Sequence, residues 1–324
     1  MDFNGTLFTQ YLIIGLASGA LIALIALGYT LVYGIVELIN FAHGEVFMMG
    51  AFFAVTVVAA SGVTNQSSGA AIVGMAIVAL AAAMLFSGAL NFAIDRVAYG
   101  RLRNAPRLAP LIAAIGVSFI LQNIGIYWKG PNPITPPPLI PAKYQRMNVL
   151  NEWFGLETKI RLRIVDVAVL GTTIPLLIAL TWFVYRTRTG KAMRATAQDR
   201  EAAALMGIDV NRTIAIAFLV GGALAGAAGM IAVYYNNSAR FQMGFRYGLF
   251  AFTAAVLGGI GNLTGAVVGA LCIGIVWSMS DGFMGQYVSG WGAQWTPAVI
   301  FGVLVLVMVF KPSGLLGEQT PDKV

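Results

Sequence analysis

The feature that most constrains this chain is a series of long stretches without a charged residue. Seven such runs can be read along the sequence: Phe3–Val36, Val46–Ile94, Leu108–Trp128, Val167–Tyr185, Thr213–Ala239, Tyr247–Ser280 and Gly282–Phe310. The hydrocarbon core of a bilayer is about 30 Å thick, and an α-helix needs about 20 apolar residues to cross it. The runs are continuously apolar and do not alternate with a period of two, so they predict membrane-spanning helices rather than barrel strands.

The composition excludes several other classes of protein. Only 10% of the 324 residues are charged and 58% are hydrophobic, whereas a soluble domain carries about 25% charged residues. A soluble enzyme, a disordered chain and a nucleic-acid-binding domain are therefore excluded, and no nucleic-acid partner is expected. The 38 glycines fit helices that pack closely through small residues. We predict an all-α polytopic membrane protein with one transmembrane domain over residues 1–324.

About eight or nine transmembrane helices are expected, one of them short or re-entrant. The run Tyr247–Ser280 is too long for one crossing and too short for two full ones. Its middle holds Gly258-Gly259-Ile260-Gly261-Asn262, where we expect a break. The expected helices are Gln10–Gly34, Glu45–Ala60, Ala70–Ile94, Leu108–Trp128, Val165–Tyr185, Arg212–Tyr235, Leu249–Leu257 (short), Thr264–Ser280 and Trp295–Phe310.

The distribution of Lys and Arg predicts which loops face the cytoplasm, because basic residues concentrate there. Basic residues cluster in the loop that follows the third expected helix and in the loop 186–211 that follows the fifth. An even number of crossings separates these loops, so both are expected inside. The loop 129–163 holds six Lys and Arg yet is expected outside. Its stretch Gly130–Pro138 is proline-rich, which favours a stiff extended segment of a folded external loop.

The loop 186–211 contains a helix-forming segment, Gln198–Gly207. Its residues are mainly Ala, Glu, Arg, Leu and Met, which favour helices, and Gly207 suits the position just after a helix end. We expect one short amphipathic helix parallel to the membrane. Its apolar face would hold Ala202, Leu205 and Met206.

Two groups of residues are candidates for a translocation path. The first contains Asn40, His43, Gly44 and Glu45, because ionisable groups at membrane depth usually face protein or water and Gly44 could interrupt a helix. The second contains Gly258, Gly259 and Asn262, as a counterpart in the other half of the chain. The alternative for the first group is a polar connection at the inner membrane surface. The alternative for the second group is close helix packing.

Nothing in the sequence indicates catalysis by this chain. It lacks the GxxxxGK[ST] phosphate-binding loop, so any ATP hydrolysis belongs to a partner. His43 is the single histidine and Cys272 the single cysteine, which leaves no catalytic cluster, CxxC metal site or disulfide framework. We therefore expect no metal and no cofactor in this chain, and we interpret Cys272 as a packing residue.

Several motifs carry a resemblance to a known family. Glu201-Ala202-Ala203 with Gly207 resembles the EAA loop of bacterial ABC import permeases, although the proline usual further along is missing. The segments Asn40–Glu45 (Asn-Phe-Ala-His-Gly-Glu), Gly221–Gly226, Phe252–Asn262 and Lys311–Gly317 (Lys-Pro-Ser-Gly-Leu-Leu-Gly) resemble the H-type permease of branched-chain amino acid ABC importers. The resemblance covers nearly the whole chain, with the motifs in the expected order.

The resemblance implies the ABC importer permease fold and a set of partners in the bacterial inner membrane. Two permease subunits, this chain with an M-type subunit or with itself, would form the pore within the membrane lipid. ABC ATPase subunits would dock on Gln198, Glu201, Ala202, Ala203 and Gly207, and a periplasmic substrate-binding protein would deliver leucine, isoleucine or valine. Transport would proceed by alternating access.

Two other functions remain open at this stage. The same architecture could import urea, short amides or another small solute, because the binding protein largely sets specificity. A secondary transporter acting alone would need acidic pairs within the membrane for ion coupling, and the scarcity of charge in the apolar runs argues against it.

Overall fold

The helices of the structure follow the apolar runs of the sequence. The computed structural model describes residues 5–36, 40–103, 105–106, 108–145, 147–155, 159–288 and 290–317. Within these residues, seven helices are long and apolar enough to cross a membrane, and two further apolar helices are shorter. The predicted all-helical membrane fold is therefore confirmed.

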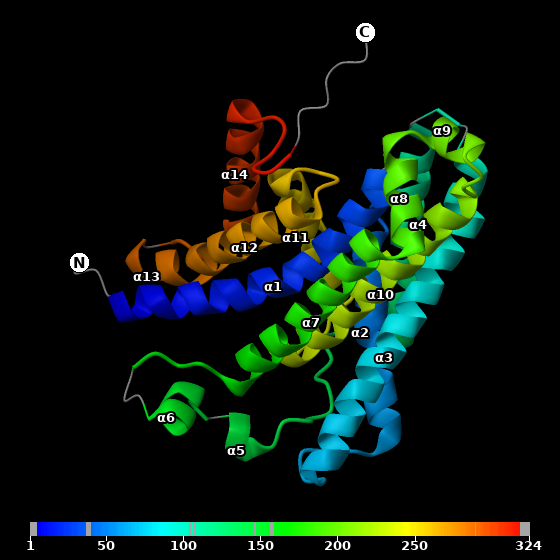
Figure 1. Ribbon diagram of the computed structural model, residues 1–324. Coiled ribbons are helices and arrows are strands. Elements are labelled where there is room, and N and C mark those ends of the chain that lie inside the picture. Colours follow the sequence, from blue (N-terminus) through cyan, green and yellow to red (C-terminus); the bar gives the residue numbers. More distant parts are fainter. Residues whose placement is uncertain are drawn as a thin grey trace.

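Figure 1 labels the helical elements in chain order. They are α1 (Gly5–Val36), α2 (His43–Ser61), α3 (Gly69–Ile94), α4 (Leu108–Lys129), α5 (Ala142–Gln145), α6 (Val149–Phe154), α7 (Ile164–Arg186), α8 (Arg188–Gln198), α9 (Arg200–Leu205), α10 (Val210–Asn236), α11 (Met243–Gly258), α12 (Leu263–Ser278), α13 (Met284–Tyr287) and α14 (Thr296–Phe310). Two π-helical turns, Asp95–Tyr99 and Met279–Phe283, extend α3 and α12, and a 3-10 turn, Gly100–Leu102, follows the first of them.

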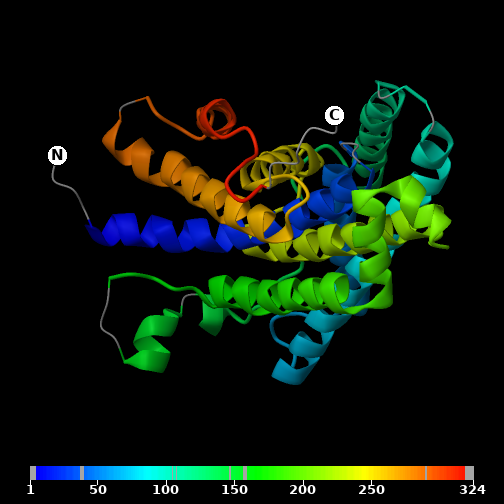
Figure 2. The same cartoon turned by 45° about the horizontal axis from the view of Figure 1, so that its top comes forward.

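Three helices, α1, α2 and α10, form the centre of the bundle, and most of their residues are buried. Helix α10 packs against both α2 and α3. Helix α12 packs along α1 (Figure 2). Helices α3, α4 and α7 lie at the periphery and expose large apolar side chains, as expected for surfaces that face lipid. The charge-free runs that read alike in the sequence thus separate into a central and a peripheral set.

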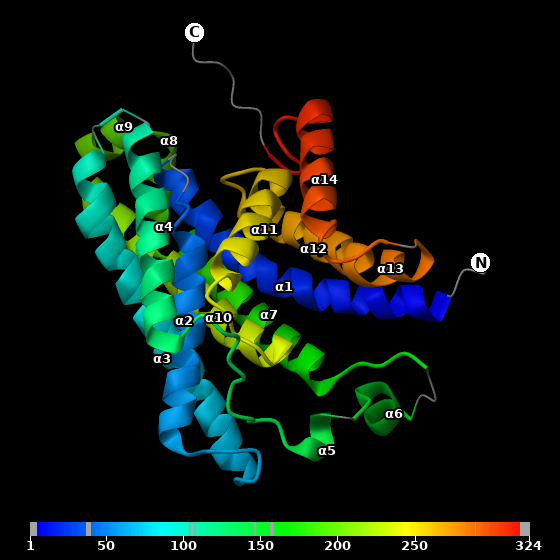
Figure 3. The same cartoon turned by 180° about the vertical axis from the view of Figure 1, so that it is seen from behind.

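The loops gather at two ends of the bundle. Helices α8 and α9 lie at one end, beside the first residues of α4, and we call this the α8–α9 end (Figures 1 and 3). Helices α5 and α6 lie at the other, which we call the α5–α6 end. The proline-rich loop 129–163 and the loop 186–211 are therefore on opposite ends, as the charge pattern requires. The side of the membrane that each end faces stays a prediction.

Glycine residues allow the helices of the bundle to approach one another at backbone distance. A Cβ atom on Gly19 of α1 would lie 2.8 Å from the Cα atom of Leu271 and 2.9 Å from the carbonyl oxygen of Ala270 on α12. On the other side of the bundle, Gly88 of α3 would meet the carbonyl oxygen of Leu219 on α10 at 3.0 Å. In lipid, where helices gain no hydrophobic energy by associating, such close approach supplies the packing attraction.

The segment 243–280 confirms one prediction and corrects another. The chain breaks after Gly258, where Gly259 has a φ of 106°, so the predicted interruption is present. The short helix before it begins at Met243 rather than at Leu249 as predicted. Arg246 lies within this longer helix, where its guanidinium is 5.2 Å from the ring centre of Trp277 and 3.6 Å from the carboxylate of Asp281. Both contacts accommodate the charge within a helix.

We predict that Gly19→Ala destabilises the protein, because the new methyl group would overlap the backbone of α12. Overpacking of this kind costs about 1–3 kcal/mol, which thermal unfolding in detergent would detect as a lower midpoint. The matched control is Gly171→Ala on α7, where a Cβ atom meets nothing within 4 Å. This control should be neutral or slightly stabilising, because alanine favours helices over glycine. Equal midpoints for the two variants would contradict the packing argument.

Candidate coupling and translocation sites

The predicted coupling segment lies across the junction of two helices, and only α9 falls wholly within it. Helix α8 ends at Gln198 and α9 begins at Arg200, whereas a single helix over Gln198–Gly207 was expected. The cause is Asp199, whose backbone is extended with φ −157° and whose side chain accepts hydrogen bonds from the backbone N–H groups of Glu201 (2.9 Å) and Ala202 (3.0 Å). Aspartate at this position caps a new helix, so the chain turns here.

The predicted role of Gly207 at the end of this segment is confirmed. Its backbone has a φ of 82°, which a residue with a side chain rarely adopts. The N–H of Gly207 donates to the carbonyl of Ala204, and the N–H of Ile208 donates to the carbonyl of Ala203, each at 3.0 Å. This pair of bonds is the Schellman motif, and it directs the chain from α9 back toward α10.

Helix α9 projects from the bundle and leaves most of its surface uncovered. Ala203 is its buried residue, while Leu205 and Met206 are 88% and 83% exposed. The apolar face predicted from the sequence is therefore not packed against this chain. Arg200 fixes the position of α9, because its guanidinium donates two hydrogen bonds, of 2.8 and 3.1 Å, to the carbonyl of Ile35 at the end of α1.

A buried ion pair lies where the coupling segment returns to α10. Arg103 contacts both carboxylate oxygens of Asp95, at 2.7 and 2.8 Å, and it also donates to the side chain of Asn211. The Asp95 side chain is fully buried and that of Arg103 is 14% exposed. The charge pattern of the sequence places Arg103 among the basic residues of the loop after the third expected helix. The signal that could have revealed the pair is an acid at the end of an apolar run with a base eight residues later.

Asn40 connects the start of α2 to two other helices. Its side-chain oxygen accepts hydrogen bonds from the hydroxyl of Tyr99 (2.7 Å) and from the backbone N–H of Ala42 (3.1 Å). Its amide donates to Asn91 of α3 at 3.4 Å, and Asn91 donates in turn to the carbonyl of Phe218 on α10 at 2.6 Å. A buried network of this kind fixes relative positions, so in this conformation Asn40 has a structural task.

His43, Gly44 and Glu45 are buried in the contact of α2 with α1 and α11. The His43 ring lies against Gly28 and 4.8 Å from the ring of Tyr29. A Cβ atom on Gly44 would lie 2.9 Å from the Cα atom of Gly248, and the Glu45 carboxylate lies beside Gly244. Their proposed role in the path stays a prediction, because the present conformation encloses all three.

The polar atoms of His43 and Glu45 lack hydrogen bonds of normal geometry within the described chain. The backbone of Ile25 approaches the imidazole and Ser118 of α4 approaches the carboxylate, but neither contact meets the geometric limits of a bond. Buried polar groups without partners are costly. Each such group in a native protein calls for an explanation, for example a functional role or a bound water or ion.

The second candidate group packs tightly at the α8–α9 end. Asn262 donates a hydrogen bond to the carbonyl of Leu316 at 2.7 Å, and the N–H of Leu316 donates to the carbonyl of Gly258 at 3.0 Å. A Cβ atom on Gly259 would overlap the backbone of Gly317. The described contacts of Gly258, Gly259 and Asn262 thus join the α11–α12 turn to the C-terminal segment 313–317 and not to the Asn40–Glu45 group. These contacts are those of close packing.

Sequence reasoning missed a cavity beside the first turns of α11. It has a volume of about 670 Å³, and it lies at the α5–α6 end, where Ile134 and Ala239 exchange backbone hydrogen bonds of 2.9 Å. Its lining mixes amide, hydroxyl, guanidinium and aromatic groups: Gln122, Asn236, Ser238, Arg240, Gln242, Met243, Phe245, Arg246, Tyr247 and Trp277. The polar stretch from Asn236 to Gln242, flanked by apolar helices, was the signal in the sequence.

A much smaller cavity lies one turn further along α11. Its volume is about 20 Å³, and its walls are mainly aromatic and glycine residues: Tyr29, Phe41, Gly244, Phe245, Gly248, Leu249 and Phe252. Phe245 lines both cavities. The wide polar cavity lies nearer the α5–α6 end, and the narrow aromatic one lies beside Gly44 and Glu45, which contact Gly244 and Gly248.

The fold and these sites define a multi-pass membrane permease with an exposed helical segment at one end. Residues 11–309 match the protein family described as "Branched-chain amino acid transport system / permease component". The chain belongs to this family, which confirms the predicted family, fold class and role as the transport component of an ABC system. Membership of such a system implies ATPase and binding-protein partners.

Individual relatives agree with the family assignment. The chain is 37% identical to the high-affinity branched-chain amino acid transport system permease protein BraD of Pseudomonas aeruginosa, over 98% of both chains. It is 35% identical to the corresponding permease protein LivH of Escherichia coli K12, again over 98% of both chains. The ribose import permease protein RbsC of Escherichia coli K12 is 29% identical over 74% of this chain and 71% of the relative. No solved structure matches the chain.

We predict that Arg103→Leu strongly destabilises the protein, because it leaves the carboxylate of Asp95 buried without its partner. Removing one member of a buried ion pair costs about 3–5 kcal/mol. The yield of monodisperse protein and its thermal midpoint in detergent measure the effect. Arg101→Leu serves as the control, since Arg101 lies in the same turn and is exposed. If both variants have the yield and thermal midpoint of the unmodified protein, the Asp95–Arg103 pair does not stabilise the α8–α9 end.

Proposed function

We propose that this chain is a pore-forming permease subunit of an ATP-driven importer for leucine, isoleucine and valine. The observation that carries the proposal is α9, a short helix held outside the bundle with uncovered apolar side chains on a chain of this permease family. An apolar surface on an otherwise polar segment suits a protein partner. An ATPase subunit that docks on α9 supplies the energy that this chain cannot generate.

Movement of the ATPase subunits reaches the membrane helices through contacts at the α8–α9 end. Arg200 joins α9 to the end of α1, and the Schellman turn at Gly207 joins α9 to α10. Helix α8 is held against α7, since the backbone of Gly190 contacts that of Val184 and Arg194 donates to the Val184 carbonyl. Docking therefore acts on three membrane-spanning helices together.

The translocation path runs along α11. The cavity of about 670 Å³ is large enough for a small amino acid and offers guanidinium and amide groups for a zwitterion. The aromatic constriction next to it, about 20 Å³ in volume, closes the path in this conformation. Alternating access requires α11 to separate from Gly44 and Glu45, which would solvate the unpaired carboxylate and open the path toward the other end.

A second permease subunit completes this path. The face of α11 that carries Phe245, Leu249 and Phe252 is not fully covered by this chain, and Phe245 is 61% exposed. An M-type permease or a second copy of this chain would cover that face. The periplasmic substrate-binding protein docks at the α5–α6 end, beside the polar cavity, and the α8–α9 end faces the cytoplasm of a bacterial cell.

Two alternatives differ in substrate or energy source. The ribose import permease among the relatives indicates that related chains can serve a sugar, and urea or short amides remain candidates. A secondary transporter would use intramembrane acids for ion coupling. The buried carboxylates of Asp95 and Asp166 are each paired with an arginine, which leaves Glu45 alone and disfavours that mechanism.

Uptake by the reconstituted complex tests the proposal. The chain is purified with its cognate second permease and ATPase subunits and inserted into liposomes, and the binding protein and ATP are added on the appropriate sides. We expect ATP-dependent accumulation of leucine, isoleucine and valine, and no uptake of ribose or urea. Uptake that persists without ATPase subunits would contradict the ABC mechanism, and selective uptake of ribose or urea would contradict the substrate.

We predict that Leu205→Ser combined with Met206→Ser abolishes ATP-dependent uptake without affecting membrane insertion, because the docking surface loses its apolar groups. The control is Lys191→Ser, an exposed residue of α8, which should retain nearly full uptake. Co-purification of the ATPase subunits measures docking directly. Glu201→Lys and Gly207→Asp should also uncouple transport, the second because φ is positive at Gly207. Normal coupling in all of these variants would refute the assignment.

A further inference from the structure

A groove at the α5–α6 end is not used by the proposed transport mechanism. It has a volume of about 540 Å³ and lies between the first turns of α1 and the segment that precedes α7. The α1 side presents Thr6, Leu7, Gln10 and Ile14, and the other side presents Lys159, Arg161 and Arg163. One wall is therefore partly apolar and the other entirely basic.

The basic wall is built from alternate residues of one extended segment. Lys159, Arg161 and Arg163 alternate with Ile160 and Leu162, and alternate side chains of an extended chain point to the same face. The segment places its three basic residues on the groove side, because all three line the groove and the two apolar residues do not.

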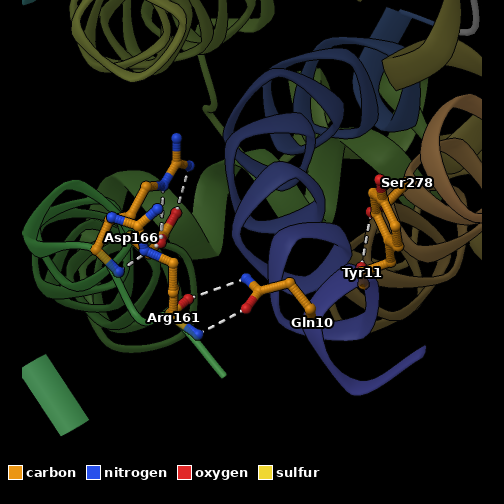
Figure 4. A network of polar contacts seen from close by, with 6 residues as sticks. Gln10, Tyr11, Arg161, Asp166 and Ser278 are labelled. Atoms are coloured by element: carbon orange, nitrogen blue, oxygen red, sulfur yellow. Dashed lines mark hydrogen bonds and ion pairs between the residues drawn. The ribbon is translucent and has the colours of Figure 1, made fainter. Parts of the chain in front are cut away.

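Hydrogen bonds hold both edges of this segment in place. On one edge, Gln10 of α1 donates to the carbonyl of Arg161 at 2.9 Å and accepts from its N–H at 2.7 Å (Figure 4). On the other edge, the Asn148 side chain donates to the carbonyl of Ile160 at 2.8 Å and accepts from the N–H of Leu162 at 3.1 Å. The row of basic residues is thus positioned before any ligand arrives, which lowers the entropic cost of binding.

Two of the three positive charges are available to a ligand. Arg163 is neutralised by Asp166, with a guanidinium–carboxylate distance of 2.7 Å, and it also lies 4.9 Å from the ring centre of Tyr235. The hydrogen bonds that Arg163 donates to Asp166 raise the pKa of the Arg163 guanidinium. Among the described residues, no carboxylate lies within ion-pair distance of Lys159 or Arg161.

The position of the groove selects among anionic ligands. It lies where the candidate membrane spans α1 and α7 begin, and the ends of such spans meet the lipid headgroups. A free phosphate would contact only the basic wall, and an acidic protein surface would not reach down to Ile14. A phospholipid contacts both walls, with its phosphate on Lys159 and Arg161 and its acyl chain along Leu7 and Ile14.

We propose that this groove is a binding site for an anionic phospholipid of the membrane leaflet at the α5–α6 end. The site also accounts for basic residues in the loop 129–163, the one loop that departs from the charge rule for external segments. Bound lipid would join α1 to the segment before α7 in addition to the Gln10–Arg161 bonds.

Lipid retention by the full-length chain tests the site. The protein in detergent is mixed with dioleoylphosphatidylglycerol or dioleoylphosphatidylcholine, and the bound lipid is counted by native mass spectrometry. We expect preferential binding of phosphatidylglycerol, weakened roughly tenfold to thirtyfold in the double variant Lys159→Gln/Arg161→Gln. The control Lys129→Gln/Lys143→Gln removes the same charge from the same loop outside the groove, and its affinity should change less than about twofold.

The remaining outcomes are equally decisive. Equal affinity in the double variant, or equal loss in the control, would overturn the site. Competition by inorganic phosphate as effective as competition by phosphatidylglycerol would show a simple anion site. Loss of binding-protein affinity with unchanged lipid retention would show that the basic wall serves an acidic protein surface instead. If the double variant unfolds in phosphatidylcholine, Lys159→Gln alone decides, with an expected loss of roughly threefold to fivefold.

Discussion

Close backbone contact between helices is the interaction on which the rest of this structure depends. In a bilayer, an apolar helix surface gains no hydrophobic free energy by exchanging lipid for another helix. Helices therefore associate through dispersion contacts and hydrogen bonds between them. Glycines of α1, α2, α10, α11 and α12 lie directly against the backbone of a neighbouring helix. These contacts determine which residues of the central helices meet, and they therefore set the positions of the buried polar side chains.

The polar groups inside this packing divide into two kinds. Asn40, Asn91 and the Asp95–Arg103 pair have their partners and hold the ends of α2, α3 and α10 together. His43 and Glu45 lack such partners although they are equally buried. A satisfied network resists separation, whereas an unsatisfied carboxylate favours any state in which water or a ligand reaches it. In the proposed mechanism, the α2–α11 contact at Glu45 is the part of the core that opens.

The sequence predicted the helices well because lipid leaves the backbone few alternatives. It predicted the break after Gly258 and the turn at Gly207, since both depend on the local properties of glycine. It placed the start of α11 wrongly, because the environment that stabilises Arg246 comes from Trp277 and Asp281 more than thirty residues away. The division of the coupling segment at Asp199 was missed for a different reason, namely that a capping side chain outweighed the helix propensity of its neighbours.

The polar stretch from Asn236 to Gln242 marks one wall of the polar cavity, but the complete walls of the cavities and the groove could not be predicted, because they come from distant segments. Gln122 of α4 and Trp277 of α12 line the same polar cavity although they are far apart in the sequence. Gln10 and Arg161 are 151 positions apart in the chain. Such pairs follow from the tertiary arrangement, which periodicity and charge counts do not contain.

Helix α1 links these separate sites in one element. Its 32 residues span about 48 Å at 1.5 Å per residue. At one end, Gln10 binds the basic segment before α7; at the other, the carbonyl of Ile35 accepts the hydrogen bonds of Arg200. Between them, Gly28 and Tyr29 contact His43. In the proposed mechanism, a partner docked on α9 would act on the same helix that supports the enclosed α2–α11 contact. A ligand in the basic groove would act on that helix from the opposite end.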